Sequence, residues 1–308
     1  MSSLIFSAPS RIGLTDSKKQ SADELLEVDR EIFRANFNRQ PFMISHHLAG
    51  HPLFTLPRLV ELSKRLPKDH VRYNAGNIPV TQELYTGPQT GLSVEETIRR
   101  IEECGSWMVL KWVEQDEEYG DLMNRCLDEV QKLSETVEPG MCKRESFIFI
   151  TSPGSITPYH MDPEHNFLLQ IKGSKTLKLL PGSALSEPEL EKYFGEGRDP
   201  VFNEESSRQA STFRLTPGRG LHFPVTVPHW VENGSEFSVS FSITFRTPAS
   251  DRRSIVYDVN NTLRRRNFKP APYGYSRLTD SAKFYAFRAV RRARKVLGLP
   301  ERDHARKY

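Results

Sequence analysis

The sequence predicts a mainly β protein with flanking helices, whose centre is an antiparallel sandwich or barrel. From about Glu145 onward, short runs rich in β-branched and aromatic residues follow one another closely, among them SFIFIT, FLLQI and FSVSFSITF. Turn signals such as SPGS, IKGS and TPGRG separate these runs. Closely spaced short strands of this kind favour antiparallel pairing over alternating strand–helix units.

The bulk composition is that of a globular protein, with 37% hydrophobic and 27% charged residues in a chain of 308. No apolar run approaches the roughly 18–20 residues of a membrane helix, and the first residues, MSSLIFSAPSRIGL, lack the features of a signal peptide. The three cysteines, Cys104, Cys126 and Cys142, are widely spaced and argue against a disulfide framework or a zinc–thiolate site. We therefore expect a cytoplasmic protein with no membrane contact.

The chain before Glu145 is predicted to be mixed α/β. In SVEETIRRIEE, Ser93 and Glu96 have the spacing of a capping box at a helix start. Thr55 is the candidate N-cap of another short helix. The pattern predicts helices over Thr55–Leu66, Ser93–Glu103 and YGDLMNRCLDEVQKL, and buried strands over Gln40–Leu48 and SWMVLKWV.

Changes in sequence texture divide the chain into four regions. Residues 1–27 are predicted to form a loose N-terminal arm, and residues 28–140 a mixed α/β part that packs on the core. Residues 141–250 form the predicted core, which a helix and a long loop interrupt at Ser183–Ser211. Residues 251–308 form a basic C-terminal segment that ends in a helix.

A histidine and a carboxylate begin one of the apolar runs. His160 and Asp162 are two residues apart, so on a strand or its extended edge both side chains point to the same face. The best candidate for a third ligand is His229 in FPVTVPHWVENG, just before the final strand. Two histidines and one carboxylate on one face of an octahedral ion form the facial triad of non-haem Fe(II) oxygenases.

The His-x-Asp pattern alone is a weak signal, and its order relative to the strands and to His229 is what favours a metal site. The rival ligand His222 lies within the apolar run GLHFPV, where a hydrogen-bonded core histidine is the better interpretation. His165 is predicted to be a second-sphere or loop residue. The pair His46 and His47 has no carboxylate nearby and is interpreted as structural.

Lys175 follows Asp162 by thirteen residues and falls in the apolar run KTLKLL. A turn at Lys172–Gly173 reverses the chain, so the strand of Lys175 would run back beside the preceding one. A lysine buried there without a partner would be costly, but beside a metal it could pair with the far carboxylate of a dicarboxylate cosubstrate. Thr157 could add a hydroxyl to the same carboxylate. The alternative is that Lys175 or Lys178 points outward to solvent.

The stretch TPYHMDPEHNFLLQIKGSKTLKLLPG, followed by LTPGRGLHFPVTVPHWVENGSEFSVSFSITF, resembles the JmjC/cupin-like family of Fe(II)- and 2-oxoglutarate-dependent oxygenases. It is most similar to the branch that contains the asparaginyl hydroxylase of hypoxia-inducible factor and its bacterial relatives. The similarity spans about residues 145–247 and rests on T-P-x-H-x-D, then N-F, then Q-I-K-G-x-K. The resemblance implies a double-stranded β-helix, or jelly-roll, core.

The resemblance also implies site residues. It assigns His160, Asp162 and His229 to iron, and Thr157, Asn166, Lys175 and Ser242 to the 2-oxoglutarate pocket. Ser242 stands where that hydroxylase has an asparagine, which leaves this contact open. The tyrosine that the family carries on an earlier strand has no clear match in SWMVLKWV.

The implied activity is hydroxylation of an unactivated C–H bond in a protein side chain, peptide or small molecule. The enzyme would bind Fe(II), consume 2-oxoglutarate and O2, and release succinate and CO2 as coproducts. One alternative is a metal-dependent cupin enzyme that does not use 2-oxoglutarate, against which Lys175 and Thr157 argue. Another is a non-catalytic metal-binding or nucleic-acid-binding module.

The C-terminal segment is strongly basic: residues 252–308 hold 16 Lys/Arg against 4 Asp/Glu. A helix is predicted over Ser281–Leu297, capped by Thr279 or Asp280, with an apolar stripe and a cationic face. We favour a helix that packs on the body or on a second copy in a homodimer. A site for nucleic acid is the less favoured alternative. LRRRNFK, at Leu263–Lys269, could line a substrate entrance.

Overall fold

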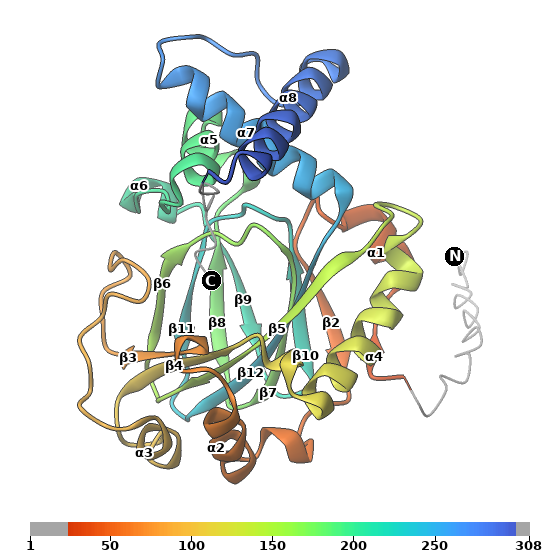
Figure 1. The fold of residues 1–308 in the computed structure, drawn as a ribbon. Helices are drawn as coiled ribbons and strands as arrows, with labels where there is room; N and C mark the ends of the chain where they lie inside the picture. The colour runs from red at the N-terminus through yellow and green to blue at the C-terminus, as the bar shows by residue number, and fades with distance from the viewer. Residues whose placement is uncertain (1–23, 300–308) are drawn as a thin grey trace, which may run out of the picture.

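The computed structural model describes residues 24–299, so residues 1–23 of the predicted arm and residues 300–308 of the basic segment lie outside it. Figure 1 shows two curved sheets that face each other, with helices around them. Every strand pairing between described residues is antiparallel. The prediction of a mainly β fold with flanking helices is confirmed.

The larger sheet has eight strands in the order β1-β2-β10-β7-β12-β5-β4-β3, and the smaller sheet has four in the order β6-β11-β8-β9. The strands are β1 Leu26–Glu27, β2 Phe42–His46, β3 Val71–Ala75, β4 Ser106–Lys111, β5 Cys142–Thr151, β6 Ile156–His160, β7 His165–Lys172, β8 Lys175–Leu179, β9 Ser211–Leu215, β10 Arg219–Phe223, β11 His229–Asn233 and β12 Ser238–Arg246. Strands β2 and β4, from the predicted mixed α/β part, pair directly with β10 and β5. The first half of the chain therefore extends the core sheet on both sides.

Eight α-helices lie within the described residues. They are α1 Arg30–Asn36, α2 Leu56–Arg65, α3 Val94–Arg99, α4 Glu117–Ser134, α5 Glu187–Glu196, α6 Glu204–Ser207, α7 Pro248–Arg264 and α8 Arg277–Val296. In Figure 1, α5 to α8 gather at one end of the two sheets, while α1 to α4 lie along the outside of the larger sheet and around its other end. None of the described helices is long and apolar enough to cross a membrane.

The main hydrophobic core lies between the outer face of the larger sheet and the helices. Along β5, Ile148 and Ile150 belong to this core, whereas Phe147 and Phe149 alternate to the inner face, between the two sheets. A second cluster on the inner side joins Leu168 to Leu177 of the opposite sheet. The inner face also carries polar side chains, and these form the candidate site.

Helix boundaries refine the sequence predictions. The capping box of Ser93 and Glu96 is present, but the helix ends at Arg99 rather than Glu103. The C-terminal helix begins at Arg277, and Ser276 caps it in place of the predicted Thr279 or Asp280. Asp280 does not cap because its carboxylate is buried and accepts a hydrogen bond from the backbone N–H of Gly274.

Helix α7 was not predicted, although its start has a clear signal. Thr247 accepts a hydrogen bond from the Ser250 N–H, and Pro248 occupies the first turn, where a missing N–H costs nothing. The predicted insertion at Ser183–Ser211 does contain a helix, α5, followed by the single turn of α6. Helices α5 and α7 pack together through Phe194 and Tyr257, whose rings stack.

Candidate metal centre and cosubstrate pocket

A bulge in β6 aligns the first candidate residues. His160 lies opposite His229 of β11, and Thr157 lies opposite Val231, so three steps on β6 match two on β11. On a regular strand, residues three apart point to opposite faces. The extra residue restores the inward direction, and Thr157 and His160 therefore share the inner face. Pro158 lies within the bulged stretch, a position that tolerates a residue without a backbone N–H.

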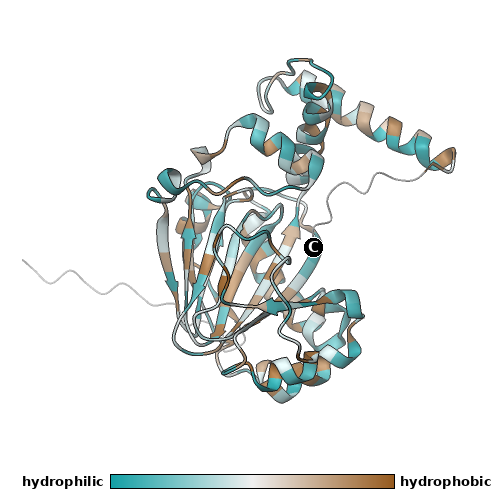
Figure 2. Ribbon diagram, turned by 90° about the vertical axis from the view of Figure 1, so that its left-hand side faces the viewer, coloured by the Kyte–Doolittle hydropathy of each residue, from teal (hydrophilic) through white to brown (hydrophobic). Residues whose placement is uncertain are grey.

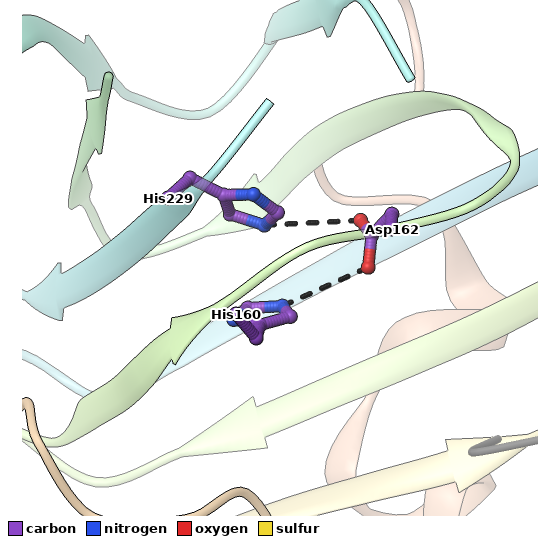
Figure 3. Close-up of side chains that lie close together, drawn as sticks. All are labelled: His160, Asp162 and His229. Atoms are coloured by element: carbon purple, nitrogen blue, oxygen red, sulfur yellow. Dashed lines mark ion pairs between the residues drawn. The ribbon is translucent and has the colours of Figure 1, made fainter. Parts of the chain in front are cut away.

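His160, Asp162 and His229 converge at one point, and no other group of three or more potential metal ligands occurs within residues 24–299. Figure 3 shows both imidazole rings directed at the Asp162 carboxylate. His160 Nε2 lies 3.7 Å from one carboxylate oxygen, and His229 Nε2 lies 3.7 Å from the other. One potential ligand atom from each side chain lies within 4.8 Å of the other two.

Backbone carbonyls orient both imidazoles. His160 Nδ1 lies 2.7 Å from the carbonyl oxygen of Pro158, and His229 Nδ1 lies 3.0 Å from that of Val227. A carbonyl only accepts hydrogen bonds, so each Nδ1 carries a proton and Nε2 is the ring atom left to bind a metal. Burial, with the adjacent His160, lowers the pKa of His229 to about 4, which keeps this imidazole neutral near pH 7.

This donor set fits a divalent transition metal. Two imidazoles and one carboxylate grouped on one side of a metal ion would leave coordination positions for small molecules on the other side. The hydrogen bonds from Nδ1 to carbonyl oxygens are those typical of metal-binding histidines. The three side chains could therefore hold Fe(II) without rearrangement of the backbone.

Asn166 and Ser242 lie next to the Asp162 carboxylate. Asn166 Nδ2 donates to Asp162 Oδ2 at 3.1 Å, and Ser242 Oγ donates to Asn166 Oδ1 at 2.8 Å. The two residues come from adjacent strands, β7 and β12. The sequence predicted contacts of these side chains with the cosubstrate, whereas their hydrogen bonds in the structure lead to Asp162. That cosubstrate contact stays a prediction.

Lys175 points inward and is buried, with 4% of its surface exposed. Among the described residues, no hydrogen bond or ion pair engages its ammonium group, and the Phe149 ring centroid lies 5.9 Å from Nζ. Burial lowers the pKa of Lys175 to about 7. Lys178 alternates outward and pairs with Glu232, and Lys172 is exposed at the turn. The arrangement suits Lys175 to an anionic ligand inside the barrel.

Thr157 faces the same interior and has a partner that sequence reasoning missed. The Trp107 indole Nε1 donates to Thr157 Oγ1 at 2.8 Å. Trp107 is buried on β4, two residues before Val109 on the same inner face. Its signal was available in SWMVLKWV, because a buried tryptophan needs an acceptor for its N–H.

The other histidines do not join the metal group. His222 is buried in β10 and stacks on Phe37 and Phe167, and burial lowers its pKa to about 3. His165 was expected in a loop or near the metal, but it is the first residue of β7 and lies 3.0 Å from the Glu138 carboxylate. His46 is buried in β2 as a structural residue.

A family model described as "JmjC domain" matches residues 121–252. Comparison with curated protein sequences gave no significant match. Among solved structures, that of E. coli ycfD is 15% identical, with a TM-score of 0.53, and the match covers 91% of this chain and 70% of that chain.

Further structures of the Escherichia coli protein also match. One, described as YcfD, a ribosomal oxygenase, is 14% identical with a TM-score of 0.48, covering 90% of this chain and 68% of that chain. Another, in complex with cobalt and 2-oxoglutarate, is 15% identical with a TM-score of 0.45, covering 87% and 67%. The domain match and the shared fold confirm the resemblance to the JmjC/cupin-like group, which for residues 121–252 is a match to the JmjC domain model.

Proposed function

We propose that this protein is an Fe(II)- and 2-oxoglutarate-dependent oxygenase that hydroxylates an unactivated C–H bond. One observation carries the proposal: three potential metal ligands and a buried lysine, which has no acidic partner within residues 24–299, face the same barrel interior. The lysine distinguishes this reading from a cupin that binds a metal alone, because a dicarboxylate cosubstrate supplies the missing negative charge.

Each proposed role follows from the position of a side chain. His160, Asp162 and His229 hold the iron, and Lys175 and Thr157 bind the distal carboxylate of 2-oxoglutarate. When bound, iron and 2-oxoglutarate supply the oxidising power for hydroxylation with O2, and the cosubstrate leaves as succinate and CO2.

Asn166 and Ser242 support the carboxylate ligand in this proposal. The Asn166 amide holds one oxygen of Asp162, which limits rotation of the carboxylate and keeps it facing both imidazoles. Ser242 fixes the orientation of that amide through its hydroxyl. The same two side chains border the predicted cosubstrate pocket and would touch 2-oxoglutarate from the side of Asp162.

The substrate class stays as broad as a protein side chain, a peptide or a small molecule. YcfD is described as a ribosomal oxygenase, so protein side chains are the first class that we would test. We propose that residues 141–250 form the catalytic core, with residues 28–140 as its support, in a protein of the cytoplasm.

We further propose that residues 251–308 serve in assembly as a homodimer. In the view of Figure 2, α8 extends away from the two sheets, with hydrophobic and hydrophilic residues along its length. Leu278, Tyr285 and Val290 of this helix are exposed. Apolar side chains on a protruding helix favour contact with a second copy over binding of nucleic acid, which we keep as the less favoured alternative.

The test is an anaerobic titration of Fe(II) and 2-oxoglutarate into the apoprotein, followed by the weak visible charge-transfer band of the bidentate complex. We expect a band in the wild type, none in Asp162→Ala and a much higher 2-oxoglutarate requirement in Lys175→Ala. Lys178→Ala is the matched control, because this lysine of the same strand points outward. Iron binding without any band would contradict the proposal and favour the cupin that does not use 2-oxoglutarate.

A further inference from the structure

Two lysines on the inner face of the barrel have no acidic partner within ion-pair distance among the described residues, and the cosubstrate accounts for only one of them. The second is Lys111, the last residue of β4, with 4% of its surface exposed. No hydrogen bond or ion pair with a described residue engages its ammonium group. Burial and the charge of Arg72 together lower the pKa of Lys111 to about 8.

The strand register places Lys111 at the metal end of the barrel. Lys111 lies opposite Phe147, and Phe147 lies opposite Ser242, so the three residues form one cross-strand row. Ser242 is the residue that connects through Asn166 to the ligand Asp162. The row of Lys111 therefore ends beside the metal site.

Lys175 lies at the other end. It is opposite Asn233, whose amide donates to the backbone oxygen of Thr151, and Thr151 is opposite Trp107. Lys111 is four residues beyond Trp107 on β4, or about 13 Å along the strand. A cosubstrate whose distal carboxylate pairs with Lys175 therefore cannot place the same carboxylate beside Lys111.

Aromatic rings and a second cation surround Lys111. Its Nζ lies 4.3 Å from the Tyr85 ring centroid and 5.8 Å from that of Trp112. Arg72 of the edge strand β3 lies opposite Val109, on the same inner face, and is exposed. Asp69 is the acid that acts on Lys111, from beyond ion-pair distance.

Tyr85 also interacts electrostatically with the candidate metal site. Burial and the charges of Asp162 and Asp199 raise the pKa of its phenol. Tyr85 and Trp112 both have positive φ angles, of 67° and 51°. Aromatic residues rarely adopt this conformation, and such strain is concentrated at functional sites.

We propose that Lys111, Arg72 and Tyr85 form a substrate subsite that binds an anionic oxygen group, either a carboxylate or a phosphate ester, beside the metal centre. The proposal rests on the proposed function, because it takes the metal site as the place of reaction. Lys111 supplies the charge in a desolvated position, Arg72 supplies a second cation from the solvent side, and the Tyr85 ring holds the lysine in place. With its anionic group bound at this subsite, the substrate would place its reacting C–H bond beside the metal.

The experiment uses full-length protein loaded anaerobically with Fe(II) and saturating 2-oxoglutarate, so that no turnover occurs. Sodium acetate and methyl phosphate are the probes, titrated separately at constant ionic strength. Bound near the paramagnetic iron, the methyl group of either probe gives a broadened proton NMR line. We expect saturable broadening with at least one probe in the wild type, at least about tenfold weaker binding in Lys111→Met, and affinity retained within about threefold in Lys111→Arg.

Lys172→Met is the matched control, because Lys172 also lies over an aromatic ring, that of Phe237, but outside the barrel. Broadening by acetate alone assigns the subsite to a carboxylate, and broadening by methyl phosphate alone assigns it to a phosphate ester. Absence of saturable broadening in the wild type, or equal affinity in Lys111→Met, would overturn the proposal. The charge-transfer band of each variant reports separately whether iron and 2-oxoglutarate are bound, and therefore whether the proposed function or the subsite has failed.

Discussion

The Trp107 indole donates a 2.8 Å hydrogen bond to the Thr157 hydroxyl inside the barrel. A hydroxyl has one proton to donate, and an indole N–H cannot accept it, so the Thr157 proton is directed to some other acceptor. Lys175, on the same inner face, offers only donors when its ammonium group is protonated. This part of the interior thus presents hydrogen-bond donors, which is the environment that a carboxylate requires.

We predict that Trp107→Phe weakens 2-oxoglutarate binding by about 3- to 10-fold, because an aromatic ring is kept while the N–H that orients Thr157 is lost. The charge-transfer titration measures this affinity. In a Thr157→Val background the same change at Trp107 should have no further effect, since the hydroxyl through which it acts is gone. Losses that simply add in the double variant would show that Trp107 acts on packing alone.

Lys175→Met should stabilise the apoprotein, because a buried cation with no acidic partner in the described part of the chain is replaced by an apolar side chain of similar length. The pKa of Lys175 falls from 10.5 to about 7 in the folded state, so between these pH values the unfolded chain binds more protons. The stability of the wild type should therefore rise as pH increases from about 7 to about 10.

The expected result of urea unfolding is a gain for Lys175→Met that is largest at pH 7 and shrinks toward pH 10. The same variant should lose 2-oxoglutarate binding. Lys178→Met, which removes an outward lysine paired with Glu232, should show neither effect. A stability gain that does not change with pH would argue that the lysine charge is already compensated in the folded protein.

Asn166→Ala should lower metal affinity by about 10- to 100-fold, because the Asp162 carboxylate loses the amide that orients it. Ser242→Ala should have a smaller effect in the same direction. Calorimetric titration with Co(II) in place of Fe(II) measures both.

Ser240→Ala is the control for Ser242→Ala. Ser240 is two residues earlier on β12 and donates to Gln170 instead of Asn166. Its loss should leave metal affinity unchanged. Equal losses for the two serine variants would indicate a general loosening of the sheet rather than a specific effect on Asp162.

Gly173→Ala should destabilise the fold and weaken 2-oxoglutarate binding. A Cβ at Gly173 would lie 2.3 Å from the carbonyl oxygen of Phe237, and the hairpin that carries Lys175 would have to shift. Gly154→Ala separates this clash from backbone strain, since Gly154 has nearly the same φ, 66° against 67°, and open space around its Cβ position.

Both glycine variants should lose about 1–2 kcal/mol of unfolding free energy to the left-handed backbone. Only Gly173→Ala should lose roughly 1–3 kcal/mol more to the clash. Chemical denaturation checks the difference, and equal losses would mean that the hairpin adapts at little cost.

The group of three potential metal ligands could be predicted because residue types and their order in the sequence identify it. A small error in the predicted strand boundaries does not change which residue types these are, namely His160, Asp162 and His229. By contrast, Lys111 and Tyr85 could not be recognised, because their significance depends on which strands become neighbours in the larger sheet. Strand order is set by packing over the whole chain, and no local pattern reports it.

Local signals explain the remaining successes and errors. The capping box at Ser93 depends on residues three apart, so the sequence contains all of it. The cap of α8 was misplaced because Asp280, a good capping residue by type, is recruited by the distant loop at Gly274. Thr247 and Pro248 are local signals for the start of α7. The helix was not predicted because these residues directly follow a run of strands.

The bulge in β6 explains why the first and last residues of the motif T-P-Y-H are an odd number of steps apart and yet face the same side. Because it shifts the strand by one position, Thr157 and His160 face the interior together, although three steps separate them. Deletion of Tyr159 would leave two steps between the two residues, and insertion of one residue would leave four. With either even spacing, the pair stays on one face only if β6 is regular and has no bulge. The candidate metal site and the candidate cosubstrate pocket therefore depend on one irregularity of β6, and a change in the length of this strand would affect both.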